Sequence, residues 1–448
     1  MMTNALSRWL IGTGTILVGA MAFTVGVLAQ TAPQYAGDVH LGVTSCSGNT
    51  CHGLATDKKV NHVLQNEYLT WQRQDQHAKA YQVLTTKESE RIARNLGLPD
   101  AKTAAICLDC HADNVPAAKR GPQFQISDGV GCESCHGGGQ RWLGPHISGS
   151  YTEAQLVQVG MYPTADPVAR ARMCLSCHFG DDHKFVTHRI MGAGHPRMSF
   201  ELNTFTQVQP AHYVVDDDYR KRKQVASGVK TWAIGQALAL EQTMGQLLNP
   251  AHASTGAFPE LVFYDCYACH HPMSDVRWSP RPDAPTGPGV PHFNDANALM
   301  LRAAAAVVAP DLGTQLEKAV QELHAAMSLG KGRPQAIAPR VRDIAHQLAD
   351  RFARREFGRD EMRGVLRQLV RLGQRGDDID YTAAEQTTMA IGSIVQTMSA
   401  AGQIDDKQLA AMRAALEGCY AATSKDNAYR PGAFVSALGA FSQTMALN

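Results

Sequence analysis

The sequence predicts a mainly α-helical protein built from two regions of different character. From about residue 295 onward, apolar residues recur at three- and four-residue spacing, which is typical of amphipathic helices. Residues 30–278 instead combine short patterned segments with glycine-rich connections and hold all the cysteines but one. A cluster of prolines, Pro280, Pro282, Pro285, Pro288 and Pro291, separates the two regions. We therefore expect short helices and long loops over residues 30–278, a stiff linker at residues 279–294 and a helical bundle at residues 295–448.

The N-terminus has the features of an export signal. Residues 10–29 carry no charge, follow the basic Arg8 and end in the small residue Ala29. Residues 1–29 are therefore predicted to be a cleaved signal peptide. The alternative is an uncleaved anchor, because about 20 apolar residues can span a bilayer. Both readings predict a periplasmic or otherwise exported protein, attached in the second case to the cytoplasmic membrane through residues 10–29.

Composition excludes some classes of protein and draws attention to two residue types. The 42 Lys and Arg against 41 Asp and Glu give a net charge of +1, so we expect no nucleic-acid partner. Hydrophobic content of 44% with 19% charged residues is ordinary for a globular chain and argues against disorder. The 11 cysteines and 18 histidines are the unusual feature, and their spacing carries the functional information.

Ten of the eleven cysteines fall into five motifs that each end in histidine. Four are regular C-x-x-C-H motifs, and the first has four residues between its cysteines; the five are Cys46/Cys51/His52, Cys107/Cys110/His111, Cys132/Cys135/His136, Cys174/Cys177/His178 and Cys266/Cys269/His270. C-x-x-C-H is the signature of covalent c-type haem attachment. Each thiol adds to one vinyl group of the porphyrin, and the adjoining histidine becomes the proximal ligand of the iron. Cys419 remains outside the motifs and is expected to be a small buried hydrophobe.

Paired cysteines have two other common uses, structural zinc binding and thioredoxin-like redox chemistry. Structural zinc also uses C-x-x-C pairs, but histidine occupies only 18 of 448 positions. Four such pairs would each be followed by histidine by chance with a probability on the order of 10⁻⁶. A thioredoxin-like motif needs a single pair. The sequence thus predicts five haem c groups, at four CxxCH sites and one CxxxxCH site, with a disulfide between Cys46 and Cys51 as the alternative at the irregular motif.

The remaining histidines are candidates for the second axial ligand of each iron. His77 lies in a predicted helix with an aromatic stripe, and His146 follows a run of three glycines. His188 and His195 lie seven residues apart in a glycine-rich stretch. The complete set of expected distal ligands is His77, His146, His188, His195, His40 and His271, the last for a neighbouring iron. His324 and His346 are expected to be structural, and the sequence leaves open the roles of His62, His183, His212, His252 and His292.

An iron with two strong axial ligands has no open position for a substrate and can only pass electrons. All five motifs end in histidine and distal candidates are plentiful, so the sequence predicts an electron carrier that serves respiratory redox partners, such as other cytochromes or a membrane oxidoreductase. The alternative is an oxidoreductase with one five-coordinate haem that acts on a small nitrogen or sulfur species. A further hypothesis is that the C-terminal bundle docks the protein to a membrane oxidoreductase.

Several of these segments resemble the multihaem cytochromes of the c-552/c-554 type. The resemblance rests on residues 45–53, 71–78, 132–137 and 174–178, and it spans roughly residues 40–280. It implies an exported relay of electrons to or from larger haem enzymes in nitrogen and related respiratory metabolism. It also implies that His77 and His146 are distal ligands. The long first motif departs from the family's pattern, and the C-terminal bundle lies outside the resemblance.

Overall fold

The computed structural model describes residues 31–445 except for seven internal segments. These are residues 56–62, 256–257, 272–280 together with 282–283 and 285, 329–332, and 378–379. The predicted signal or anchor at residues 1–29, the undecided His62 and much of the proline cluster lie outside the described residues. Residues 31–448 form one compact unit.

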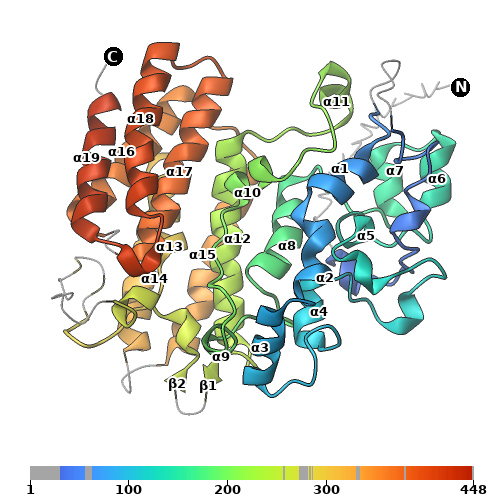
Figure 1. The fold of residues 1–448 in the computed structure, drawn as a ribbon. Helices are drawn as coiled ribbons and strands as arrows, with labels where there is room; N and C mark the ends of the chain where they lie inside the picture. Colours follow the sequence, from blue (N-terminus) through green and yellow to red (C-terminus); the bar gives the residue numbers. More distant parts are fainter. Residues whose placement is uncertain are drawn as a thin grey trace, which may run out of the picture. The chain divides into compact units, whose positions relative to one another are not determined.

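The described chain is mainly α-helical, as predicted (Figure 1). In the first region the helices are short, apart from the last. They are α1 (Glu67–Gln74), α2 (Ala80–Val83), α3 (Lys87–Leu96), α4 (Ala105–His111), α5 (Cys132–His136), α6 (Leu143–Ser148), α7 (Glu153–Gln158), α8 (Pro167–His178), α9 (His188–Gly192), α10 (Leu202–Val208), α11 (Asp217–Arg222) and α12 (Gly228–Leu248). Between them lie loops and single 3₁₀ turns: η1 (Pro33–Tyr35), η2 (Val43–Ser45), η3 (Gln76–Lys79), η4 (Ala117–Lys119), η5 (Ile126–Asp128), η6 (Leu261–Phe263) and η7 (Cys266–Ala268). One antiparallel pair of two-residue strands, β1 (Ser254–Thr255) and β2 (Phe258–Pro259), completes this region.

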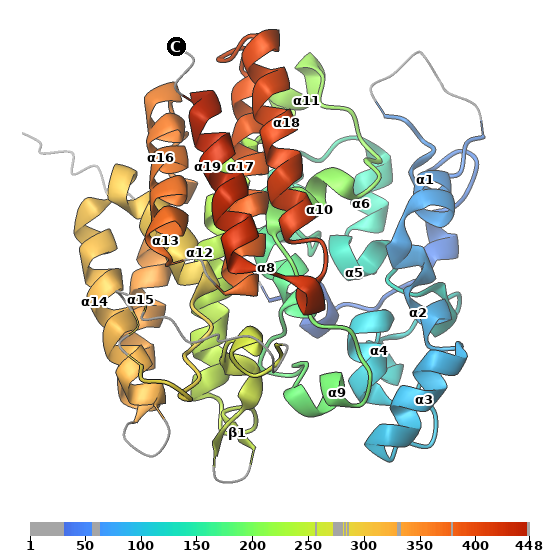
Figure 2. The same cartoon turned by 60° about the vertical axis from the view of Figure 1, so that its left-hand side comes forward.

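The second region contains seven longer helices within its described part. They are α13 (Ala296–Val308), α14 (Pro310–Met327), α15 (Pro334–Ala353), α16 (Arg359–Arg375), α17 (Tyr381–Ala400), α18 (Asp406–Ala422) and α19 (Pro431–Met445), with the turn η8 (Asp426–Ala428) before the last. Pro310, Pro334 and Pro431 each open a helix, where the missing proline N–H costs no hydrogen bond. Gly376 ends α16 with φ of 84°, a left-handed conformation that glycine adopts without strain. Neighbours in sequence pack together, as α14 with α15 and α18 with α19 (Figure 2).

Helix α12 connects the two regions through a shared apolar core. Its residues from Val229 to Leu240 are all buried, because it packs against α13, α15 and α17 as well as against α8 and α10. One cluster of buried apolar side chains therefore runs from Ala171 to Phe441. The division into domains at residues 279–294 stays a prediction, but the core does not stop there.

The N-terminal part of the first region has few apolar side chains to pack. Its separate cluster contains only five buried residues, Leu84, Ala93, Ala101, Leu108 and Ala112. Haem groups at the predicted motifs would add apolar surface in this part of the chain. Among the described helices, none combines the length and the hydropathy that a bilayer crossing requires.

Candidate haem sites

Each cysteine motif forms a tight local turn that brings its two thiols to one side. We number the motifs, and the sites they define, 1 to 5 in chain order. Motifs 2, 3 and 4 lie in α4, α5 and α8, each of which ends at the motif histidine. Residues three apart in a helix share a face, so the C-x-x-C spacing presents both thiols together and leaves the histidine next to them. No two cysteines of the described chain are joined in a disulfide.

The irregular first motif absorbs its extra residues in a hydrogen-bonded loop. Cys51 N–H donates to the Gly48 carbonyl at 2.8 Å, and His52 N–H donates back to the Cys46 carbonyl at 3.1 Å. His52 therefore remains next to both thiols despite the four-residue spacer. A Cβ on Gly53 would come within 1.9 Å of the Ser47 carbonyl oxygen, so only glycine fits directly after this histidine.

Every motif histidine faces a second histidine from a distant part of the chain. The ring-centroid separations and interplanar angles are 6.0 Å and 14° for His52 with His146, 6.4 Å and 81° for His111 with His195, 6.2 Å and 84° for His136 with His212, 6.0 Å and 90° for His178 with His77, and 6.1 Å and 36° for His270 with His188.

These separations are what two imidazoles on opposite sides of one metal ion require. A metal–nitrogen distance of about 2.0 Å and about 1.1 Å from nitrogen to ring centre place the two centroids about 6.2 Å apart. The centroids of aromatic rings in direct contact also lie about 4.5–7 Å apart, so the separation in a single pair would not indicate a metal site. Direct stacking is seen at His178 with Phe200, at 4.5 Å. The five pairs that contain a motif histidine all fall between 6.0 and 6.4 Å, one metal-sized gap. His292 and His324 lie 6.3 Å apart without a motif histidine, so the motif together with the distance identifies a site.

Four of the paired rings have their Nδ1 atom engaged, which leaves Nε2 for a metal. His52 Nδ1 lies 2.9 Å from Glu67 Oε2, and His77 Nδ1 lies 2.8 Å from Asp75 Oδ1. His111 Nδ1 donates to the Ala80 carbonyl at 3.1 Å, and His195 Nδ1 donates to the Pro196 carbonyl at 2.8 Å. Metal-ligating histidines almost always bond their other nitrogen in this way, which fixes the ring's orientation and tautomer.

Burial keeps two of the motif histidines neutral at pH 7. It lowers the pKa of His136 to about 3 and the pKa of His178 to about 4. A neutral imidazole has the free lone pair that coordination needs. The donor set, its spacing and its protonation therefore fit the iron of haem c.

The structure sorts the distal candidates of the sequence into two groups. His77, His146, His188 and His195 each face a motif histidine. So does His212, whose role the sequence left open. It lies in the loop after α10, in no motif or helical pattern that could have singled it out.

His40 and His271 were also expected to be ligands, and the contacts that the structure gives them are of another kind, so their role stays a prediction. His40 is fully buried and its Nδ1 lies 2.7 Å from Asp113 Oδ2. Its Nε2 is buried without a hydrogen bond, as a ligand nitrogen would be before the metal is added, so a ligand role for His40 stays a prediction. The His271 ring lies 6.0 Å from the Tyr267 ring.

Thiols from different motifs lie side by side, so neighbouring sites are close in space. The sulfur atoms of Cys46 in motif 1 and Cys132 in motif 3 lie close together, as do those of Cys110 in motif 2 and Cys177 in motif 4. Burial raises the pKa of Cys135, and the nearby thiols of motif 4 add to that shift. Sites 1 and 3, 3 and 4, and 4 and 2 are therefore neighbours.

The motifs, their paired histidines and the mainly helical fold define a c-type cytochrome. Residues 45–137 match the family model described as "Cytochrome c554 and c-prime", a stretch that contains the first three motifs. That stretch is about a fifth of the chain and is similar to cytochromes of the c554 type. Together with the motifs it supports a c-type cytochrome that binds haem c covalently and acts in electron transfer. Cytochromes of this class are typically exported. No curated protein and no solved structure matches the chain.

Proposed function

We propose that this protein is an exported electron carrier with five haem c groups, each iron held between two histidines. The five histidine pairs carry the proposal, because each joins a motif histidine to a second imidazole across one metal-sized gap. Haem c supplies a one-electron couple at each site. Paired imidazoles leave no iron position open to a substrate, which favours transfer over catalysis.

The contacts between motifs support a definite order of sites along the electron path. Sites 1 and 3 meet at Cys46 and Cys132, and sites 4 and 2 meet at Cys177 and Cys110. Sites 2 and 5 share one short segment, since α9 begins at His188 of site 5 and is followed by His195 of site 2. With site 3 beside site 4, the order of neighbours is 1, 3, 4, 2, 5, which differs from the order of the motifs in the chain.

Both ends of this path reach the surface, as a carrier between two partners requires. At site 1, Ile147 follows the distal His146 and is 70% exposed. At site 5, Cys269 is exposed. Site 5 also adjoins the helical bundle, where Tyr267 donates a hydrogen bond to the Tyr429 carbonyl at 3.3 Å. We propose that redox proteins, such as another cytochrome or a membrane oxidoreductase, dock at these two ends.

Export and attachment are proposed from the sequence alone. Residues 1–29 direct the chain out of the cytoplasm, and haem c is attached after export. An uncleaved segment at residues 10–29 would keep the exported protein on the membrane. Mass spectrometry of the N-terminus of the exported protein distinguishes cleavage from anchoring.

The test of the carrier proposal is the haem number and spin state of the purified, exported protein. Intact mass should show five added haems, and electron paramagnetic resonance of the oxidised protein should show only low-spin iron. Fewer haems would refute the count. One high-spin iron that responds to cyanide or nitric oxide would instead support the oxidoreductase with a five-coordinate haem.

A further inference from the structure

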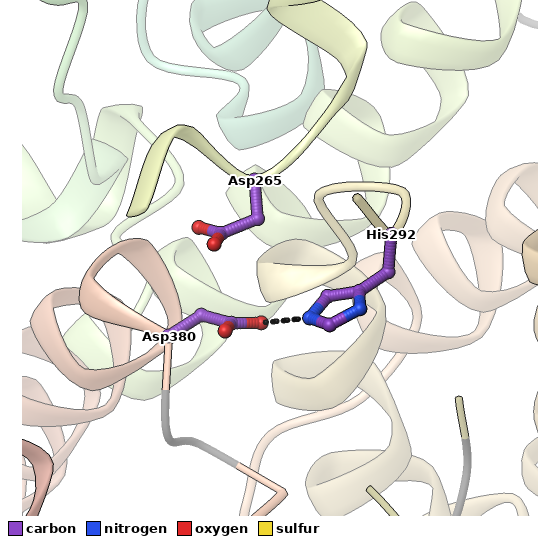
Figure 3. A group of neighbouring side chains, drawn as sticks. All are labelled: Asp265, His292 and Asp380. Atoms are coloured by element: carbon purple, nitrogen blue, oxygen red, sulfur yellow. Dashed lines mark ion pairs between the residues drawn. The ribbon is translucent and has the colours of Figure 1, made fainter. Parts of the chain in front are cut away.

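A buried group of three side chains lies beside site 5 and has no part in haem binding. Asp265, His292 and Asp380 converge from three segments: the loop before η7, the loop before α13 and the residue before α17 (Figure 3). One ligand atom from each lies within 4.8 Å of the other two. Two carboxylates and an imidazole are a donor set that suits divalent transition metals.

One carboxylate oxygen in this group lacks any partner among the described residues. Asp265 is 2% exposed, and its Oδ2 accepts a hydrogen bond from Ala268 N–H at 2.7 Å. Its Oδ1 is buried with no hydrogen bond. A buried carboxylate oxygen left this way costs free energy unless a cation or a proton compensates it.

The charged side chains around these three residues have a net negative charge that a divalent ion could balance. Arg281 donates to Asp380 at 2.7 Å through Nη1 and to Asp295 at 2.7 Å through Nη2. His324 Nε2 lies 3.1 Å from Asp295 Oδ2, and His292 Nε2 lies 3.5 Å from Asp380 Oδ2. Burial lowers the pKa of His292, but the hydrogen bond and charge of Asp380 outweigh it and raise that pKa, so a proton on His292 competes with an ion. Once that proton has left, three buried carboxylates face one guanidinium, and one divalent ion would neutralise the net charge of −2.

We propose that Asp265, His292 and Asp380 bind a divalent transition-metal ion of the zinc type, separate from the haem irons. Ligands on one zinc ion lie at most about 4.2 Å apart, so a small inward movement of the side chains completes the site. A water molecule would fill the fourth position. The ion would link two segments, the turn that contains Cys266 and the start of α17. Site 5 would then be held against the helical bundle.

A shared proton is the competing way to satisfy the same atoms. Burial, followed by the charge of Asp380, raises the pKa of Asp265 to about 8. A protonated Asp265 would donate a hydrogen bond within the group and leave no need for a metal. The experiment must therefore distinguish a bound ion from a bound proton.

The test uses the exported protein carrying its full haem complement, so that no motif thiol is free to bind zinc. The protein is loaded with Zn²⁺, dialysed, and analysed for zinc and iron by elemental mass spectrometry. We expect about one zinc per chain beyond the haem iron. Asp265→Asn should lower the retained zinc at least about tenfold, because its carbonyl oxygen still caps the Ala268 N–H but the anionic ligand is gone.

Asp217→Asn is the matched control, since it removes an exposed carboxylate at the start of α11. It should retain zinc as the unmodified protein does. Competition between the unmodified protein and a chelator measures the same site without any variant, in case Asp265→Asn fails to fold. No zinc retained at full haem content would overturn the proposal in favour of the proton. Haem content and spin state, recorded on the same samples, test the carrier function independently.

Discussion

Replacing His212 by alanine tests the pairing that only the tertiary structure reveals. His212 faces His136 at 6.2 Å, so its loss should remove one axial ligand from the iron of site 3 and leave the other four pairs intact. About one fifth of the haem iron should become five-coordinate and high-spin. After reduction, about one carbon monoxide should bind per chain, against none in the unmodified protein.

Electron paramagnetic resonance and carbon monoxide difference spectra measure this change directly. Added imidazole should occupy the space left by the side chain and restore the low-spin spectrum. His346→Ala is the matched control, because His346 lies exposed on α15 and contacts Glu241 rather than a motif histidine. An entirely low-spin His212→Ala protein would refute the assignment of His212 to site 3.

Three further substitutions test local contacts. His40→Ala should leave all irons low-spin but lower the unfolding free energy by about 3 kcal/mol in urea denaturation, since Asp113 keeps a buried charge without its partner; a new high-spin iron would show that His40 is a ligand after all. Glu133→Ala should cost about 2–4 kcal/mol in the same assay, because its carboxylate accepts three backbone N–H groups at 2.6–2.7 Å; a stability equal to that of the unmodified protein would contradict this role. Gly53→Ala should reduce haem occupancy at site 1, as a Cβ would meet the Ser47 carbonyl oxygen at 1.9 Å, and an intact mass still showing five haems would count against that view of the loop.

The fold was predictable wherever short-range patterns decide it. Apolar spacing predicted the helices after residue 295, and several of their observed ends fall at prolines and glycines, as at Pro310, Pro334 and Gly376. The role of α12 was not predictable, because a helix that is apolar on all sides shows only that it is buried. Which helices surround it, and hence that one core extends from Ala171 to Phe441, depends on packing between distant segments.

The candidate sites divide in the same way. Four of the five paired distal histidines could be selected from their setting in the sequence, while His212 in its loop gave no signal. His40 looked equally suitable, and its Nδ1 is engaged by Asp113 just as Asp75 engages that of His77. The difference is that His77 lies opposite the motif histidine His178, a contact between distant segments that sequence neighbours do not reveal.

By itself, the sequence determined the chemistry of attachment. Two thiols and a histidine within five to seven residues are held together by the backbone, so the spacing alone identifies a c-type haem motif and its proximal ligand. Only the tertiary structure decided what lies opposite each motif histidine, the order 1, 3, 4, 2, 5 in which the sites adjoin, and the meeting of Asp265, His292 and Asp380. The physical reason is that these are contacts between segments far apart in the chain, which exist only once the helices have packed.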